Sequence, residues 1–299
     1  MIELQLSDDE HAAKKLKPEH LQQAVAAIRK DGFVVLHRAI DPNHIAVLRE
    51  RMLADVDEIL ALDDVPYQFK NGHLQQSPPP FPPYLFRDVL ANDLVVDVTQ
   101  AVLGEGVKNA FYSGNTCLPN PHQQPLHVDS GQLWPDLRQA TPAYNLVVNV
   151  PIVDTTPKNG STELWPGTHL DTTRAMSDGD IKLAPADEER QRAKCQPLQP
   201  SIPAGSVLIR DLRLWHRGMP NHSEQARPMI AMIHWPRWWH IGKPLLFAKG
   251  TEALFTDSAL ETVAEFVDGP IDYISRNRKH DYKPPADAVP HGASRRHSK

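Results

Sequence analysis

Residues 206–234 read SVLIRDLRLWHRGMPNHSEQARPMIAMIH, and this stretch decides how the fold is interpreted. It holds two runs rich in Val, Ile, Leu and Met, separated by a segment with Gly, Pro and Asn, which is typical of two strands joined by a turn. The first run ends in His216, and Arg227 opens the second. Similar runs come earlier, at residues 109–113, 126–129, 144–153 and 161–165. Five or more short strands with long Pro- and Gly-bearing connections predict an antiparallel barrel or sandwich.

The N-terminal third carries helix signals instead. Pro18 suits a first helical position, and Gly32 follows the apolar-periodic segment as a stop. Asp41 and Pro42 then open a longer helix, whose apolar residues recur at intervals of three and four. Further elements are expected at 33–36 (strand), 93–103 (helix) and 260–266 (helix). Because the helices precede the run of strands, the sequence predicts an α+β protein with helices against one side of the sheet.

Two segments have loop character. Residues 66–83 include the run SPPPFPP at 77–83, which is incompatible with a central strand or a helix interior. We expect a long loop there, either a lid over the site or a simple connector. From Arg276 to the C-terminus, seven Lys or Arg stand against two Asp. Residues 283–299 are therefore expected to form a flexible basic tail, more simply solvated than bound to a phosphate or a membrane surface.

Composition excludes several functional classes. The 299 residues carry a net charge of −5, which argues against a general nucleic-acid binder. The two cysteines cannot form a disulfide framework, and no apolar run approaches the length of a membrane span. No P-loop, dinucleotide fingerprint, G-x-S-x-G or H-E-x-x-H motif is present. We expect a cytoplasmic protein that has no nucleic-acid or membrane partner.

Three residues have the chemistry of a metal site. In a strand, His127 and Asp129 would point to the same face, which brings an imidazole and a carboxylate together. His216 lies 87 residues further on, far enough for intervening strands to return it to the first pair. Two His and one carboxylate form the facial triad of non-haem Fe(II) oxygenases. Arg227 would need a partner if buried, and a carboxylate ligand would supply one.

With these residues in place, the sequence resembles the phytanoyl-CoA dioxygenase family of Fe(II)/2-oxoglutarate-dependent oxygenases. The resemblance covers most of the chain, from DGFVVL at 31–36 through His127-x-Asp129 and NGSTELWPGTH at 159–169 to His216 and Arg227. The short length and proline-rich loop are similar to members that tailor natural products. The resemblance implies one domain at 1–282 that precedes the tail at 283–299. Within that domain it implies a helical part at about 18–104 and a double-stranded β-helix (jelly-roll) core at about 108–240.

The resemblance also implies roles for individual residues. It places Fe(II) on His127, Asp129 and His216, and a carboxylate of 2-oxoglutarate on Arg227. It suggests Gln124 and Thr162 as further cosubstrate contacts. Some members carry a hydroxyl two residues after the second His; Gly218 stands there in this chain, so Thr162 is the candidate for that role. An aspartate at 129 leaves no room for chloride and argues against a halogenase.

The implied reaction uses O2 to oxidise, most simply to hydroxylate, a C–H bond of a small organic molecule, and converts 2-oxoglutarate to succinate and CO2. Aromatic and polar residues near the expected mouth are the candidates for substrate contacts: Trp134, Arg237, Trp238 and Gln76. A homodimer is a further expectation. Four other readings stay open at this point: a desaturation, an epoxidation or a ring rearrangement in secondary metabolism; a CoA thioester substrate; a zinc hydrolase; and a non-catalytic jelly-roll binding protein.

Overall fold

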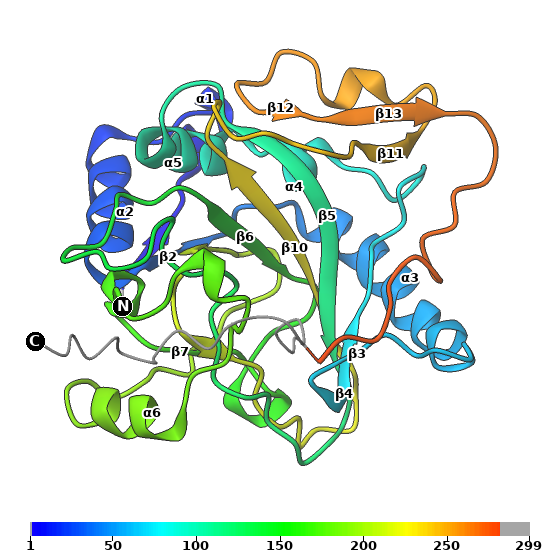
Figure 1. The fold of residues 1–299 in the computed structure, drawn as a ribbon. Coiled ribbons are helices and arrows are strands. Elements are labelled where there is room, and N and C mark those ends of the chain that lie inside the picture. Colours follow the sequence, from blue (N-terminus) through cyan, green and yellow to red (C-terminus); the bar gives the residue numbers. More distant parts are fainter. Residues whose placement is uncertain (1, 282–299) are drawn as a thin grey trace, which may run out of the picture.

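The computed structural model describes residues 2–281, and the expected tail at 283–299 lies outside them. A large mixed sheet forms the centre of the molecule (Figure 1). Its strands, in spatial order, are β1 (Glu3–Gln5), β2 (Phe33–His37), β8 (Val207–Asp211), β6 (Leu146–Pro151), β10 (Arg227–Trp235), β5 (Lys108–Cys117), β4 (Lys70–Gln75) and β3 (Tyr67–Gln68), and β12 (Glu261–Thr262) also pairs with β5.

A second, much shorter layer of strands faces this sheet. It contains β7 (Glu163–Leu164), which pairs with β9 (His216–Arg217). Isolated bridges extend the layer, among them His127 with His216 and Leu164 with Leu198. A separate two-stranded sheet of β11 (Leu245–Ala248) and β13 (Ala264–Val267) packs beside the helices. Two facing layers of mostly antiparallel strands make up the double-stranded β-helix that the family resemblance implies.

Helices cover the outer face of the large sheet. They are α1 (Asp8–Ala13), α2 (Pro18–Asp31), α3 (Pro42–Leu60), α4 (Arg87–Leu90) and α5 (Asp93–Leu103). The helix α6 (Pro185–Arg192) lies on the other side of the molecule and is not part of this layer. The local signals act as expected: the Asp41 side chain accepts a hydrogen bond from Asn43 N, and Gly32 ends α2 with φ +89°. Short 3₁₀ turns lie at Pro157–Asn159, Thr168–Leu170, Met176–Asp178 and Glu252–Leu254.

Alternation along the strands separates the hydrophobic core from the inner cavity. In β10, Ile230 and Met232 join the core formed with α2, α3 and α5, whereas Met229, Ala231 and Ile233 line a cavity on the opposite face. Successive side chains of a strand point to opposite faces, so one strand can serve both purposes. The outer face therefore stabilises the sheet, and the inner face is available for polar residues.

Three sequence expectations about local structure are wrong. Residues 260–266 form the strands β12 and β13 rather than a helix. The segment ETVAEFV has apolar positions that fit either period, and two partner strands decide between them: β5 pairs with β12, and β11 pairs with β13. Residues 126–129 do not form a regular strand: His127 makes isolated bridges with His216 and Lys182. The shared direction of His127 and Asp129 is therefore set by these contacts rather than by a ladder.

The third correction concerns residues 66–83. Tyr67–Gln75 form a hairpin of β3 and β4, and β4 pairs with β5 at the edge of the large sheet. Residues Pro78, Pro79 and Pro80 are buried behind it. Proline excludes only the segment after Ser77 from the sheet, because β4 ends before the first proline. This region is a packed edge of the sheet and not a long loop.

No helix among residues 2–281 is both long and apolar enough to cross a lipid bilayer.

Candidate metal centre and cosubstrate pocket

A cavity of about 300 Å³ lies between the two layers of strands. Cross-strand pairing arranges its floor in rows, since paired residues of neighbouring strands point to the same face. From one end to the other, the rows are His73–Cys117–Arg227, Gln75–Asn115–Met229, Ala231–Asn149 and Ile233–Val147–Arg210. All of these residues line the cavity. Its roof carries His127, Asp129, His216, Gln124 and Thr162.

His127, Asp129 and His216 converge in this roof as the sequence predicts. One side-chain donor atom from each lies within 4.8 Å of the other two. Asp129 Oδ1 is 3.9 Å from His127 Nε2 and 3.5 Å from His216 Nε2. Backbone hydrogen bonds in both directions between His127 and His216, 3.1 and 2.9 Å long, hold the two histidines side by side. The three donors can therefore bind one ion from the same side.

Hydrogen bonds fix which nitrogen of each imidazole is free. His127 Nδ1 lies 2.9 Å from the carbonyl of Pro125, and His216 Nδ1 lies 2.9 Å from that of Leu214. A carbonyl only accepts, so each Nδ1 carries the proton and each Nε2 presents a lone pair toward Asp129. A protonated Nδ1 bonded to a carbonyl is the usual orientation of a metal-binding histidine.

Burial and neighbouring charges set the protonation of the triad. Burial lowers the pKa of His127 and takes that of His216 well below its usual value, so both rings are neutral. For Asp129 burial acts in the opposite direction, but the pKa of the carboxyl is nevertheless lowered, chiefly by the charge and the hydrogen bond of Arg210. Two neutral nitrogens and one carboxylate are the donor set that suits Fe(II).

Arg210 is a functional residue that the sequence analysis missed. Its Nη2 is 2.6 Å from Asp129 Oδ2, and its Nε donates to Asn149 Oδ1 at 3.2 Å. It therefore orients the carboxylate and leaves Oδ1 to face the histidines. The signal was present: Arg210 interrupts the apolar run Val-Leu-Ile in β8, and the argument applied to Arg227 applies equally to it.

Arg227 lies at the other end of the cavity floor and has unused hydrogen-bonding capacity. The side chain is 3% exposed, and its Nε and Nη1 have no hydrogen-bond partner among the described residues. Burial lowers its pKa, but guanidinium remains a cation at neutral pH. A buried guanidinium with two unused donors fits a carboxylate of 2-oxoglutarate. Both the triad and Arg227 thus fit the cofactors that the resemblance implies.

Gln124 and Thr162 reach the same cavity in different ways. Gln124 Oε1 accepts a hydrogen bond from Gly218 N at 2.8 Å, so one of the two lone pairs of its amide oxygen is used. Thr162 lines the cavity and is partly buried. A Cβ at position 218 would lie 2.9 Å from both Gln124 Oε1 and His73 Nδ1. These two side chains occupy the space that a side chain at 218 would need.

The four candidate substrate residues do not line the cavity. Gln76 is fully buried; its Nε2 donates to Met52 O, and its Oε1 accepts from Thr116. Trp134, Arg237 and Trp238 are exposed, the two tryptophans to 59% and 65%. The cavity wall is instead built by seven other residues: Gln68, Phe69, His73, Gln75, Phe111, Asn115 and Ile181. Four of them belong to the β3–β4 hairpin, and the prediction of a long loop at residues 66–83 gave them no defined direction toward the cavity.

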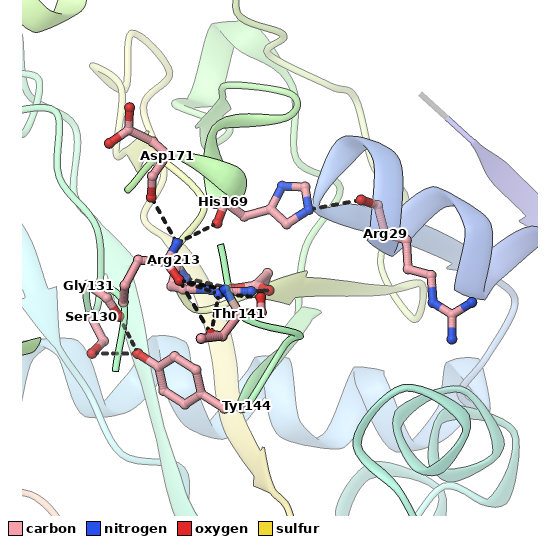
Figure 2. Close-up of polar contacts among 10 residues, drawn as sticks. Arg29, Ser130, Gly131, Thr141, Tyr144, His169, Asp171 and Arg213 are labelled. Carbon is pink, nitrogen blue, oxygen red and sulfur yellow. Dashed lines mark hydrogen bonds and ion pairs between the residues drawn. The ribbon is translucent and has the colours of Figure 1, made fainter. Parts of the chain in front are cut away.

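A buried polar network anchors the chain on either side of the triad (Figure 2). Arg213 makes two hydrogen bonds to Asp211, at 2.9 and 2.7 Å, and others to Gln132 and Thr141. In Figure 2 the Tyr144 hydroxyl points to Ser130 and Gly131, just after Asp129. These contacts join the segment that follows Asp129 to the one that precedes His216.

Other histidines have structural contacts. The ring of His169 reaches the Arg29 carbonyl at 3.2 Å, as Figure 2 also shows, and so braces its turn against α2. His234 lies on the face of β10 opposite to Arg227 and contacts Thr99.

Comparison with known proteins identifies the family. The family model described as phytanoyl-CoA dioxygenase (PhyH) matches residues 28–229, a span that includes the triad and Arg227. The chain belongs to the phytanoyl-CoA dioxygenase family. It is an enzyme, a non-haem Fe(II)/2-oxoglutarate-dependent oxygenase, and its cofactors are Fe(II), 2-oxoglutarate and O2.

Solved structures of other proteins share the fold of this PhyH-family chain. EctD from S. alaskensis, solved with 2-oxoglutarate and 5-hydroxyectoine, is 17% identical, with a TM-score of 0.55 over 89% of this chain and 85% of EctD. The non-heme alpha ketoglutarate dependent carbocyclase SnoK from nogalamycin biosynthesis is 18% identical, with a TM-score of 0.52 over 75% of this chain and 85% of SnoK. AviO1 from Streptomyces viridochromogenes Tue57 is 19% identical, with a TM-score of 0.53 over 74% of this chain and 97% of AviO1.

Proposed function

We propose that this oxygenase hydroxylates an unactivated C–H bond of a small organic molecule, with Fe(II) held by His127, Asp129 and His216. The observation that carries the proposal is that one cavity contains both the triad and Arg227, whose Nε and Nη1 have no hydrogen-bond partner among residues 2–281. A binding protein that had lost its chemistry would have no use for this combination, and a zinc hydrolase would leave Arg227 unexplained.

Each residue has a distinct part in the proposed mechanism. When bound, Fe(II) activates O2 at the expense of 2-oxoglutarate, which leaves as succinate and CO2. His127, Asp129 and His216 would hold this ion with one donor atom each. Arg210 keeps the Asp129 carboxylate ionised and oriented. Arg227 binds the far carboxylate of 2-oxoglutarate, with Gln124 and Thr162 beside it. The apolar part of the wall, which includes Phe69 and Phe111, would exclude water from the reacting C–H bond.

The relatives support a role in the tailoring of natural products, since SnoK is described as coming from nogalamycin biosynthesis. Desaturation, epoxidation or ring rearrangement would use the same residues, and SnoK, described as a carbocyclase, is an example of an outcome other than hydroxylation. The homodimer stays a prediction.

An anaerobic titration tests the metal and cosubstrate assignment. Fe(II) and then 2-oxoglutarate are added to the metal-free protein, and the visible charge-transfer absorption of the chelate is recorded. We expect the band in the wild type and its loss in Asp129→Ala and in His216→Ala. The matched control is His240→Ala, since His240 is exposed. A band that persists in both triad variants would contradict the ligand assignment, and iron binding without a band would favour the hydrolase.

A further inference from the structure

A belt of three side-chain amides lines the cavity next to the row of residues that contains Arg227. Gln68 and Gln75 come from the β3–β4 hairpin, and Asn115 comes from β5 beside them. Asn115 Nδ2 donates to Gln68 Oε1 at 2.8 Å, and Gln68 Nε2 donates to Gln75 Oε1 at 2.6 Å. Gln75 Nε2 then donates to Ser113 Oγ at 3.3 Å. The chain of hydrogen bonds fixes all three amides in place.

The belt still has hydrogen-bonding capacity left over. An amide offers two donors and two acceptor lone pairs, so each belt member uses only part of its capacity within the chain. Asn115 Oδ1, at the head of the chain, accepts no hydrogen bond from any described residue. Gln68 is 5% exposed, so its remaining N–H can reach little but a molecule in the cavity. Buried polar groups of this kind normally find a partner.

The charged groups of the cavity are already assigned. Asp129 and Arg210 pair with each other at 2.6 Å, so their charges offset each other although Arg210 Nη1 has no hydrogen-bond partner among the described residues, and Arg227 faces the cosubstrate. Burial lowers the pKa of His73 to about 4, so this ring is neutral at physiological pH. The remaining lining is apolar or neutral, and it includes Phe69, whose ring centroid is 4.7 Å from that of His127. A charged substrate group would lose its hydration here without gaining a counter-ion.

Size restricts the substrate further. Small-molecule sites span about 300–1,000 Å³, and this cavity of about 300 Å³ has to take the cosubstrate as well. Either the substrate is small or only one part of it enters.

From this arrangement we infer that the substrate, or the part of it that enters the cavity, is uncharged and carries hydroxyl or carbonyl groups that the Gln68–Gln75–Asn115 belt binds. Its apolar carbon lies against Phe69 and Phe111, beside the metal centre. The inference rests on the proposed function, because the triad and Arg227 are taken as the sites of iron and cosubstrate.

Three probes of one shape test this inference: cyclohexanecarboxamide, cyclohexanecarboxylate and cyclohexylmethylammonium. Each is titrated anaerobically into the Fe(II)–2-oxoglutarate complex, and the change in the charge-transfer band is followed. We expect the carboxamide to bind about tenfold or more tightly than either charged probe, a difference of about 1.4 kcal/mol. Equal or tighter binding of a charged probe, or no binding by any of the three, would overturn the inference.

Variants make the test specific to the belt. Asn115→Leu should remove the preference for the carboxamide, and Asn115→Asp should shift it to the ammonium probe. Gln123→Leu is the matched control, since Gln123 is an exposed amide outside the cavity. An unchanged preference in both Asn115 variants contradicts the inference. If the charge-transfer band never forms, the proposed function fails instead; calorimetry of the three probes with the metal-free protein still reports on the belt.

Discussion

At the scale of single residues, the Asp129 carboxylate depends on Arg210. We expect Arg210→Leu to weaken Fe(II) binding by about 10–100-fold, the usual cost of losing a partner of a metal ligand. The carboxylate would lose both its ion pair and its orientation. Isothermal titration of the metal-free protein with Fe(II) under argon measures the effect. The comparison variant is Arg237→Leu, an exposed arginine outside the cavity. Wild-type affinity in Arg210→Leu would remove Arg210 from the site.

The effect of Arg227 on stability is expected to change sign when 2-oxoglutarate binds: the residue destabilises the free protein and stabilises the loaded one. Its guanidinium is buried with two unused donors, which costs free energy until an anion arrives. Arg227→Met should therefore leave the stability of the metal-free protein unchanged or raise it, and should abolish the stabilisation that 2-oxoglutarate gives the iron-loaded wild type. Thermal unfolding with and without 2-oxoglutarate measures both. A variant still stabilised by 2-oxoglutarate would show that the cosubstrate binds elsewhere.

At the scale of elements, the segments around the triad are held by the network of Arg213 rather than by regular strand ladders. Arg213 and Asp211 are 3% and 1% exposed, so the loss of one partner leaves a buried charge unpaired. We expect Arg213→Met to lower the free energy of unfolding by about 3–5 kcal/mol, and Asp211→Leu/Arg213→Met to lower it by less than the two single changes together.

The wild type, the two single variants and the double variant form a double-mutant cycle, and urea denaturation measures the free energy of unfolding of each. The surface pair Arg38–Asp8, with side chains 63% and 87% exposed, is the control, and Arg38→Met should change the free energy of unfolding by less than about 1 kcal/mol. An additive cycle at Asp211 and Arg213 would mean that the two side chains act independently.

At the scale of the whole molecule, buried neutral histidines make stability depend on pH. Burial lowers the pKa of His234 to about 3, while the unfolded chain titrates near 6.5. Between these values the unfolded state binds the extra proton, so stability is full above pH 6.5 and falls as the pH drops toward 3. His73, with a pKa of about 4, acts in the same direction.

His234→Gln should reduce this dependence, because glutamine can still bond Thr99 but does not titrate. The slope of stability against pH should fall by up to about 1.4 kcal/mol per pH unit between pH 6 and 4. Denaturation curves at several pH values give the slope. His240→Gln, at an exposed position, should leave it unchanged. A wild-type slope in His234→Gln would contradict the buried, neutral state of His234.

The sequence by itself determined the features that depend on local chemistry. Pro18, Gly32 and the Asp41 cap set helix ends through backbone geometry, and alternation in β10 divided core from cavity. Residue type and spacing also singled out His127, Asp129, His216 and Arg227, because few side chains can bind a metal or a buried carboxylate. The structure brings all four to one cavity.

The tertiary structure alone decided what depends on distant partners. The β3–β4 hairpin exists because β4 finds the edge of β5, and this pairing puts Gln68 and Gln75 beside Asn115. Arg210 meets Asp129 across 81 residues of sequence, and the segment at 126–129 is aligned by bridges to His216 and Lys182. The identity of the partner in each of these contacts leaves no local pattern, since it is set by which strands lie side by side. The residues that bind the metal and the cosubstrate could therefore be predicted from the sequence, whereas the arrangement of the cavity wall that contacts the substrate could not.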